Sequence, residues 1–249
     1  MNSLMVNIRN KTYPNGFCAI ENLSFSAQPG EFVAIVGPSG SGKTTLLNLI
    51  AGLDAKMEGT IGFNPDDLQI NHRKIGFMFQ EPRLMPWLNV RQNLELVLPA
   101  HLRAQDASNL EQWLTLVGLS GCGPLYPGQL SGGMQRRVAL LRAFIVKPDV
   151  LLMDEPFQSL DAPTAQQLRV LLKDLCQRTR PTVLFVTHSL REALGLADRI
   201  LFLSASPSQV ILDFSVDLKQ HQPNDETRVQ RMHSSLLAQY PRLLSGHVA

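Results

Sequence analysis

The chain has 249 residues, of which 44% are hydrophobic and 18% are charged, a composition typical of a folded globular protein and not of a disordered one. Its formal net charge of +2 is too small for broad nucleic-acid binding, so we expect no nucleic-acid partner. The three cysteines, Cys18, Cys122 and Cys176, form no CxxC pair, which argues against a disulfide framework or a zinc site and fits a reducing cytoplasm.

The first part of the chain has mainly the pattern of strands. Residues 4–35 alternate apolar and polar side chains and are broken by Pro/Gly turns, which predicts a small antiparallel sheet. Residues 31–36 form a compact apolar strand, helical spacing follows over residues 44–53, and residues 58–80 return to strand and turn patterns. Prolines then separate several helical runs between residues 81 and 128, which predicts an inserted helical lobe.

The second half has the pattern of an α/β core. Helices are predicted over residues 131–146 and 163–178. Residues 149–153 and 182–186 are continuous apolar runs, typical of strands buried on both faces of a parallel sheet. Short strands and a polar helix are expected in the last 40 or so residues.

A glycine-rich loop carries the strongest local motif. Its sequence matches GxxxxGK[ST] and lies between the predicted strand and helix: Gly37, Pro38, Ser39, Gly40, Ser41, Gly42, Lys43 and Thr44. Glycines let several backbone N–H groups turn toward one phosphate, and the following helix directs its positive end at the same anion. Lys43 would reach the outer phosphates, the Thr44 hydroxyl would hold Mg²⁺, and Thr45 would also contact the nucleotide. We therefore predict phosphate binding rather than an ordinary Gly/Ser turn.

Two adjacent carboxylates, Asp154 and Glu155, follow the apolar strand at residues 149–153. They would repel one another without a nearby cation, which a bound Mg²⁺ supplies. Because side chains alternate along an extended segment, the two carboxylates should point in different directions. We assign Asp154 to the metal and Glu155 to the base that activates the attacking water. The alternative is an acidic turn without a catalytic role.

A second helix start carries Ser131, Gly132 and Gly133, and its bare backbone amides could also bind an anion. An ordinary N-cap with a flexible first turn is the simpler interpretation of these three residues. The residues alone do not explain why one nucleotide would need two such helix starts.

Ser131-Gly132-Gly133-Met134-Gln135 resembles the signature motif of ABC ATPases. From about Leu4 to Phe202 the chain is similar to that family in the order of its motifs: phosphate loop, Gln80, helical lobe, signature, Asp154-Glu155, Asp161 and His188. The resemblance implies a P-loop NTPase core with a parallel sheet, an N-terminal antiparallel β subdomain and an inserted α-helical subdomain. It also implies ATP hydrolysis with Mg²⁺, in a dimer where each signature helix meets the nucleotide of the other subunit.

The resemblance also suggests a division of the chain, which we treat as one ABC ATPase domain over residues 1–249. Residues 1–80 and 138–204 would form the nucleotide-binding core with its antiparallel part. Residues 81–137 would form the helical subdomain, and residues 205–249 a C-terminal extension.

Several roles follow from matching positions in that family. Tyr13 would stack on the adenine, with Phe17 as the fallback and simple packing as the alternative. Gln80 would reach Mg²⁺ and the attacking water, and would report nucleotide state to the helical lobe. His188 would contact the γ-phosphate, and Asp161 would communicate across the dimer. The signature residues Ser131, Gly132, Gly133 and Gln135 would bind the partner subunit's nucleotide.

One segment departs from the family pattern. Phe157-Gln158-Ser159-Leu160 precedes Asp161, where relatives usually have two small residues ahead of the leucine. The bulkier, polar Gln158 would alter dimer contacts or timing, but it removes no catalytic group.

Residues 79–90 resemble a group of importer ATPases for nitrate, sulfonates, taurine and thiamine precursors, through the run Glu81-Pro82-Arg83-Leu84-Met85-Pro86-Trp87. Trp87 and Leu88 would form an apolar knob that receives a short helix of a membrane subunit; the alternative places Trp87 in the core. An exporter or lipid-transporting ATPase would share the catalytic motifs. Soluble ABC ATPases of DNA repair or translation fit less well, because their coiled-coil insertions and tandem cassettes have no counterpart here.

The expected location follows from these features. The N-terminus shows no signal-peptide pattern, and no stretch reaches the roughly 18 apolar residues that a membrane-spanning helix needs. We expect a peripheral protein on the cytoplasmic side of the inner membrane. Its partners would be a second ATPase subunit, integral membrane permease subunits and, indirectly, a periplasmic or extracellular solute-binding protein.

Overall fold

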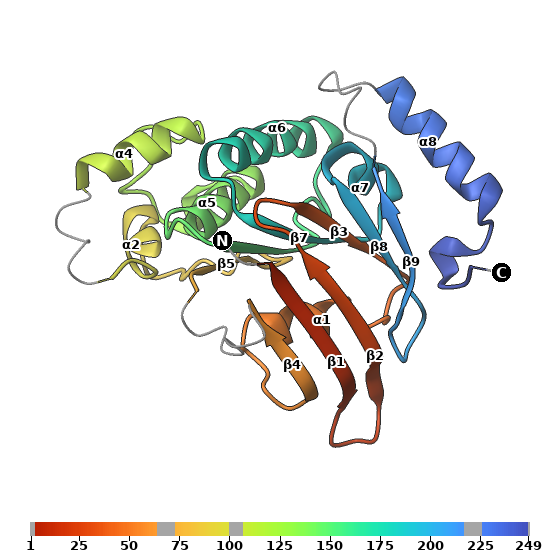
Figure 1. Cartoon of the computed structure of the whole chain (residues 1–249). Helices are drawn as coiled ribbons and strands as arrows, with labels where there is room; N and C mark the ends of the chain where they lie inside the picture. Colours follow the sequence, from red (N-terminus) through yellow and green to blue (C-terminus); the bar gives the residue numbers. More distant parts are fainter. Residues whose placement is uncertain (1–2, 64–72, 100–106, 217–225, 249) are drawn as a thin grey trace. The chain divides into compact units, whose positions relative to one another are not determined.

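A computed structural model of the chain describes residues 3–63, 73–99, 107–216 and 226–248 (Figure 1). For residues 107–109 it describes the backbone only. The chain divides into two compact units. The first unit comprises Met1–Arg73, Leu152–Glu155 and Thr182–Ala249, and the second comprises Lys74–Leu151 and Pro156–Pro181. The predicted division into core, helical subdomain and extension follows other boundaries and stays a prediction.

The first unit contains an antiparallel sheet with the strand order β2-β1-β4 (Figure 1). Its strands are β1 (Leu4–Thr12), β2 (Cys18–Ala27) and β4 (Glu58–Gly62). Over residues 4–9 of β1, buried and exposed residues alternate strictly, as expected for a sheet with one covered face. The pairing of β1 with β4 shifts between Ile8 and Asn10, which changes the face on which later residues lie.

A mainly parallel sheet forms the core of the same unit. β3 (Phe32–Val36) lies between β7 (Thr182–Thr187) and β8 (Arg199–Leu203), parallel to both. β9 (Val210–Ser215) pairs with β8 in the antiparallel direction and forms one edge of the sheet. β3 and β7 are buried along their whole lengths, which explains their continuous apolar sequences. The predicted α/β fold with a parallel sheet and an antiparallel β part is confirmed.

Four helical segments complete the described part of the first unit. They are α1 (Lys43–Ile50), α7 (Leu190–Leu196), α8 (Glu226–Gln239) and the 3-10 turn η3 (Leu243–Ser245). α1 ends three residues before the predicted boundary at Leu53. α8 packs on α7, and Leu236 is its buried residue.

The second unit is mostly helical. Its helices are α2 (Val90–Glu95), α4 (Ala107–Leu116), α5 (Gly132–Phe144) and α6 (Ala162–Thr179), with the 3-10 turn η2 (Pro127–Gln129). It also holds β5 (Ile75–Met78), whose neighbour in the sheet is β6 (Val150–Asp154). β6 is divided between the units: its first two residues belong to the second unit, and its last three belong to the first unit, which also holds β7. β5 approaches α5 so closely that a Cβ on Gly76 would lie 2.2 Å from the carbonyl oxygen of Ala143.

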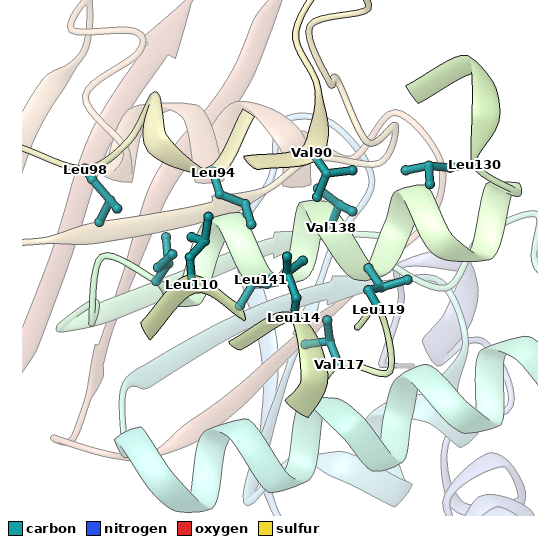
Figure 2. Close-up of a cluster of buried hydrophobic side chains, with 11 residues drawn as sticks. Val90, Leu94, Leu98, Leu110, Leu114, Val117, Leu119, Leu130, Val138 and Leu141 are labelled. Atoms are coloured by element: carbon teal, nitrogen blue, oxygen red, sulfur yellow. The ribbon is translucent and has the colours of Figure 1, made fainter. Parts of the chain in front are cut away.

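Leucine and valine side chains from α2, α4 and α5 form the core of the second unit (Figure 2). Leu94, Leu114, Val138 and Leu141 are among its fully buried members. This cluster confirms helical structure within residues 81–128, although residues 100–106 of that stretch lie outside the described part, as do residues 64–72 of the predicted strand and turn region. No helix in the described ranges is long and apolar enough to cross a membrane.

Candidate active site

The phosphate loop fills the six residues between β3 and α1. Each of its three glycines has a reason to lack a side chain, and for Gly40 this is a left-handed φ of 76°. Gly42, the N-cap of α1, has a left-handed φ of 87°, and a Cβ on Gly37 would lie 2.9 Å from Ser41 Oγ and 3.1 Å from Leu203 Cβ. Because the first N–H groups of a helix have no partner within it, the start of α1 offers donors to an anion.

Lys43 lies at the first position of α1 and is 6% exposed. Its Nζ donates to the carbonyl oxygens of Gly37 (2.9 Å) and Pro38 (2.7 Å) and to Ser41 Oγ (3.3 Å). Burial lowers the pKa of the Lys43 ammonium, whereas the charges of Glu155 and Asp154 act to raise it. The loop therefore holds a buried ammonium with two carboxylates nearby. This arrangement suits an anionic ligand that carries a bound metal ion, because the ammonium attracts the anion and the carboxylates attract the metal.

Asp154 ends β6 and is 5% exposed. Thr44, on α1, donates its hydroxyl to Asp154 Oδ2 over 2.8 Å. The structure thus brings together two predicted metal ligands that are 110 residues apart in the sequence. Both are hard oxygen donors of the kind that Mg²⁺ prefers.

Glu155 turns the chain out of the strand with a left-handed φ of 45°. Such a conformation is uncommon in residues other than glycine and costs of order 1–3 kcal/mol. The prediction that extended alternation separates the two carboxylates is therefore wrong: a turn separates them, so that Asp154 contacts Thr44 and Glu155 contacts His188.

His188 follows β7 directly, and its Nδ1 lies 2.9 Å from Glu155 Oε2. The histidine side chain is 59% exposed and the glutamate side chain 18% exposed. Glu155 is also anchored through its backbone, since its N–H donates to the carbonyl of Val186. The proposed base and the proposed γ-phosphate contact are thus direct neighbours.

Tyr13 follows β1 and is half-buried. Its hydroxyl lies 3.0 Å from the Thr45 hydroxyl on α1, so the structure brings the predicted adenine-stacking residue to the helix that follows the phosphate loop. The Nζ of Lys11 lies 4.7 Å from the centre of the Tyr13 ring. The fallback residue, Phe17, is 48% exposed and stacks on Tyr13 with ring centres 6.5 Å apart.

In the second unit, the signature residues open α5. Ser131 is its N-cap and accepts the N–H of Met134 over 3.3 Å. Gln135 donates instead to the carbonyls of Pro127 (3.0 Å) and Leu130 (3.4 Å), so its amide braces the preceding turn. Ser131 and Gly132 are exposed, and a Cβ on Gly132 would meet nothing within 4 Å. Internal packing therefore does not account for the glycine at this position.

The Gln80 side chain also lies in the second unit, where its Nε2 donates to Gln158 Oε1. Arg136 of α5 donates to the carbonyls of Gln80 (2.8 Å), Pro156 (3.1 Å) and Gln158 (2.7 Å). Sequence analysis missed Arg136, because hydrogen bonds to main-chain carbonyls leave no residue pattern. The departure at Gln158 is therefore a direct contact of Gln80.

Asp161 caps α6 and accepts hydrogen bonds from the Thr164 N–H (2.8 Å) and hydroxyl (2.9 Å). These bonds hold the pKa of the exposed Asp161 carboxyl below its ordinary value. Both of these hydrogen bonds lie within the first turn of α6 itself. The structure thus gives Asp161 a helix-capping role beside its predicted role across the dimer.

Trp87 is 71% exposed, so the alternative that placed it in the core is wrong. The loop that presents it is braced by Asn93, which is fully buried. The Asn93 amide donates to the carbonyls of Met85, Leu88 and Asn89 and accepts the N–H of Met85. A fixed loop with an exposed indole is a suitable protein-binding surface.

A strand, a phosphate loop and a helix, with the aspartate of an Asp-Glu pair bonded to that helix, define a P-loop nucleotide-hydrolysing protein. The ABC transporter family model matches residues 20–158, more than half of the chain. The chain belongs to the ABC transporter family, as an ATP-binding ATPase of that family.

Relatives extend this similarity over most of the chain. The chain is 44% identical to an aliphatic sulfonates import ATP-binding protein, SsuB 1, of Pseudomonas aeruginosa, over 85% of each chain. It is 38% identical to an SsuB protein of Bacillus cereus, over 90% of this chain and 88% of the relative. A solved dimeric structure of the ATP-binding cassette MJ0796, in a post-hydrolysis state bound to ADP and Pi, has a TM-score of 0.70 and 33% identity. It covers 86% of this chain and 98% of that cassette.

Proposed function

We propose that the chain is the ATPase subunit of an importer for aliphatic sulfonates. The observation that carries this proposal is the 44% identity to a sulfonate import ATP-binding protein over 85% of both chains. The run from Glu81 to Trp87 supports the same solute group by resemblance. The relatives' import names also favour this assignment over an exporter.

The first unit would bind and hydrolyse the nucleotide. Lys43 would exchange its loop carbonyls for the outer phosphate oxygens of ATP, which are stronger acceptors because they are charged. Thr44 and Asp154 fit Mg²⁺ by their oxygen chemistry and their contact, and Gln80 is assigned to the same ion by the resemblance alone. When bound, Mg²⁺ neutralises charge on the phosphates.

Glu155 would accept the proton of the attacking water. Its carboxylate is partly buried and contacts His188, while its backbone N–H donates to the carbonyl of Val186. His188 would orient Glu155 through Nδ1 and place its other ring nitrogen toward the γ-phosphate. If Glu155 is not the base, His188 is the next candidate because it is the side chain in contact with it.

A second subunit would complete the site. The exposed, unobstructed helix start at Ser131 and Gly132 suits an anion supplied by another chain, because a closely approaching phosphate needs bare amides and no side chain. Gly133 and Gln135 would maintain the shape of that helix start, and Asp161 would lie in the dimer contact. The related cassette is described as a dimer, which supports the same assembly here.

The membrane partner would be a permease that docks on the Trp87 loop, from the cytoplasmic side of the inner membrane. An exposed indole on a loop that a buried amide fixes provides apolar contact area at low entropic cost. A solute-binding protein on the other side of the membrane would select the sulfonate and deliver it to the permease.

The test is reconstitution of this chain with its permease and binding protein in proteoliposomes. We expect an alkanesulfonate-loaded binding protein to stimulate ATP hydrolysis and sulfonate uptake. A complex carrying the Glu155→Gln subunit serves as the hydrolysis control. Stimulation by nitrate or by a thiamine precursor, but not by any alkanesulfonate, would reject the solute assignment and leave the ATPase assignment intact.

A further inference from the structure

Lys11 is a buried cation that the proposed reaction does not use. It is 2% exposed, and among the described residues it and Lys43 are the two buried lysines. Its Nζ donates to Asp54 Oδ2 over 2.6 Å and to the carbonyl oxygen of Lys56 over 2.8 Å. Burying an ammonium is costly even when it is paired, so the ion pair alone is weak evidence for a role in stability.

The same ammonium lies against the Tyr13 ring, 4.7 Å from its centre. Asp54 is only partly exposed and also accepts the N–H of Lys56, so the segment that follows α1 fixes the position of the Lys11 Nζ. At its other end, the Tyr13 side chain is held by the 3.0 Å contact between its hydroxyl and Thr45. The ring is therefore constrained both at one face and at its hydroxyl.

We propose that Lys11 is a positioning residue for nucleobase recognition, which acts by fixing the orientation of the Tyr13 ring on which the adenine stacks. The inference rests on the proposed stacking role of Tyr13. A cation is attracted to the negative face of an aromatic ring, so Lys11 selects one ring orientation before ATP arrives. Fixing the ring in advance lowers the conformational entropy that stacking would otherwise cost.

The experiment compares a ligand that has a base with one that has none. Calorimetric titration of the full chain with MgATP and with magnesium triphosphate gives two dissociation constants for each variant. We expect Lys11→Met to weaken ATP binding about three- to tenfold and to leave triphosphate binding unchanged within about twofold. Arg9→Met removes the same charge from an exposed position on the same strand and should leave both constants unchanged.

A double-mutant cycle with Tyr13→Ala tests whether Lys11 acts through the ring. Tyr13→Ala should weaken ATP binding about tenfold, and adding Lys11→Met should then have no further effect. Equal weakening of ATP and triphosphate by Lys11→Met, or an undiminished effect in the Tyr13→Ala background, would overturn the inference.

Two further variants keep the test decisive. If Lys11→Met does not fold, the double variant Lys11→Met/Asp54→Asn removes both members of the ion pair and should give the same selective loss. Lys11→Arg keeps a cation that can lie over the Tyr13 ring and should retain ATP affinity within about threefold. If Tyr13→Ala itself leaves ATP binding unchanged, the stacking role of Tyr13 is wrong; if only Lys11→Met does so, the positioning role alone is wrong.

Discussion

The two units carry their functional residues in different ways. In the first unit, the candidate residues contact each other: Thr44 contacts Asp154, and Glu155 contacts His188. In the second unit, Ser131 and Gly132 are exposed, and the Ser131 side chain caps the start of α5 by accepting the N–H of Met134.

This difference separates a site assembled within one chain from a surface that awaits another molecule. The contacts in the first unit join residues remote in sequence, so folding itself brings the catalytic groups together. The helix start in the second unit is fully formed, yet nothing in the packing of the described residues requires a glycine at position 132.

The largest effect is expected for Glu155→Gln in the first unit. The amide keeps the size of the side chain but cannot accept the proton, so turnover should fall roughly 10²–10⁴-fold. ATP affinity should survive because a negative charge near the triphosphate is removed. Size-exclusion chromatography with and without MgATP should then show an accumulated dimer. A variant that stays monomeric and hydrolyses ATP at the wild-type rate would show that Glu155 is not the base.

The next largest effect is expected for Gly132→Asp in the second unit. The new carboxylate would face the partner subunit's nucleotide, and like charges brought together cost several kcal/mol, so hydrolysis should fall about 10²-fold or more. Folding should be unharmed because the position is open and an acidic residue suits a helix N-terminus.

Gly132→Ala is the matched control, because it adds a side chain without a charge and should lose less activity than Gly132→Asp. Thermal unfolding and ATP titration of the isolated subunit complete the measurement. Loss of nucleotide binding by the lone Gly132→Asp subunit would contradict an action on the partner's site.

A smaller effect, on binding, is expected for Lys43→Ala. Removing the ammonium deletes charge-assisted bonds to the phosphates, which should weaken ATP about 10–10²-fold. Titration with a fluorescent ATP analogue measures the loss. Unchanged affinity would be incompatible with the phosphate-loop assignment. Together with Gly132→Asp, this variant sharpens the contrast, since one should lose binding and the other only hydrolysis.

The smallest effect is expected for Arg136→Met, which removes three hydrogen bonds to carbonyls in the second unit. Because these groups are partly solvated, the free energy of unfolding should fall by about 1–3 kcal/mol. Urea unfolding measures this change. Arg178→Met is the control, since it removes only an exposed pair with Asp174 and should cost at most about 0.5 kcal/mol. Equal stability of the two variants would show that the carbonyl contacts of Arg136 contribute little.

Much of the fold was predictable because three strands of the parallel sheet are buried along their whole lengths. Continuous apolar runs marked β3, β6 and β7 to within one residue of their observed ends, with the loop motif placed between β3 and α1. The position of Lys11 was not predictable. Alternation along β1 would place residue 11 on the exposed face, but the pairing shift after Ile8 turns it inward.

The sequence proposed the residues of the candidate site but not the contacts between them. The order of motifs identified Asp154, Glu155 and His188, while the left-handed turn at Glu155 had no signal, because non-glycine residues rarely adopt that conformation. Arg136 also gave no signal, since its partners are main-chain carbonyls from two separate loops.

The open space around Gly132 has a consequence for how variants of this protein would be selected. A side chain at Gly76 collides with the backbone of α5, so a substitution there lowers the amount of folded protein. Among the residues that the structure describes, a side chain at Gly132 meets nothing within 4 Å, so the cell should accumulate such a variant at normal abundance. A library scored by protein abundance should therefore tolerate almost any residue at position 132, whereas one scored by growth on the transported solute as a nutrient should retain glycine. The difference between the two scores would mark the surface that belongs to the assembly rather than to the fold.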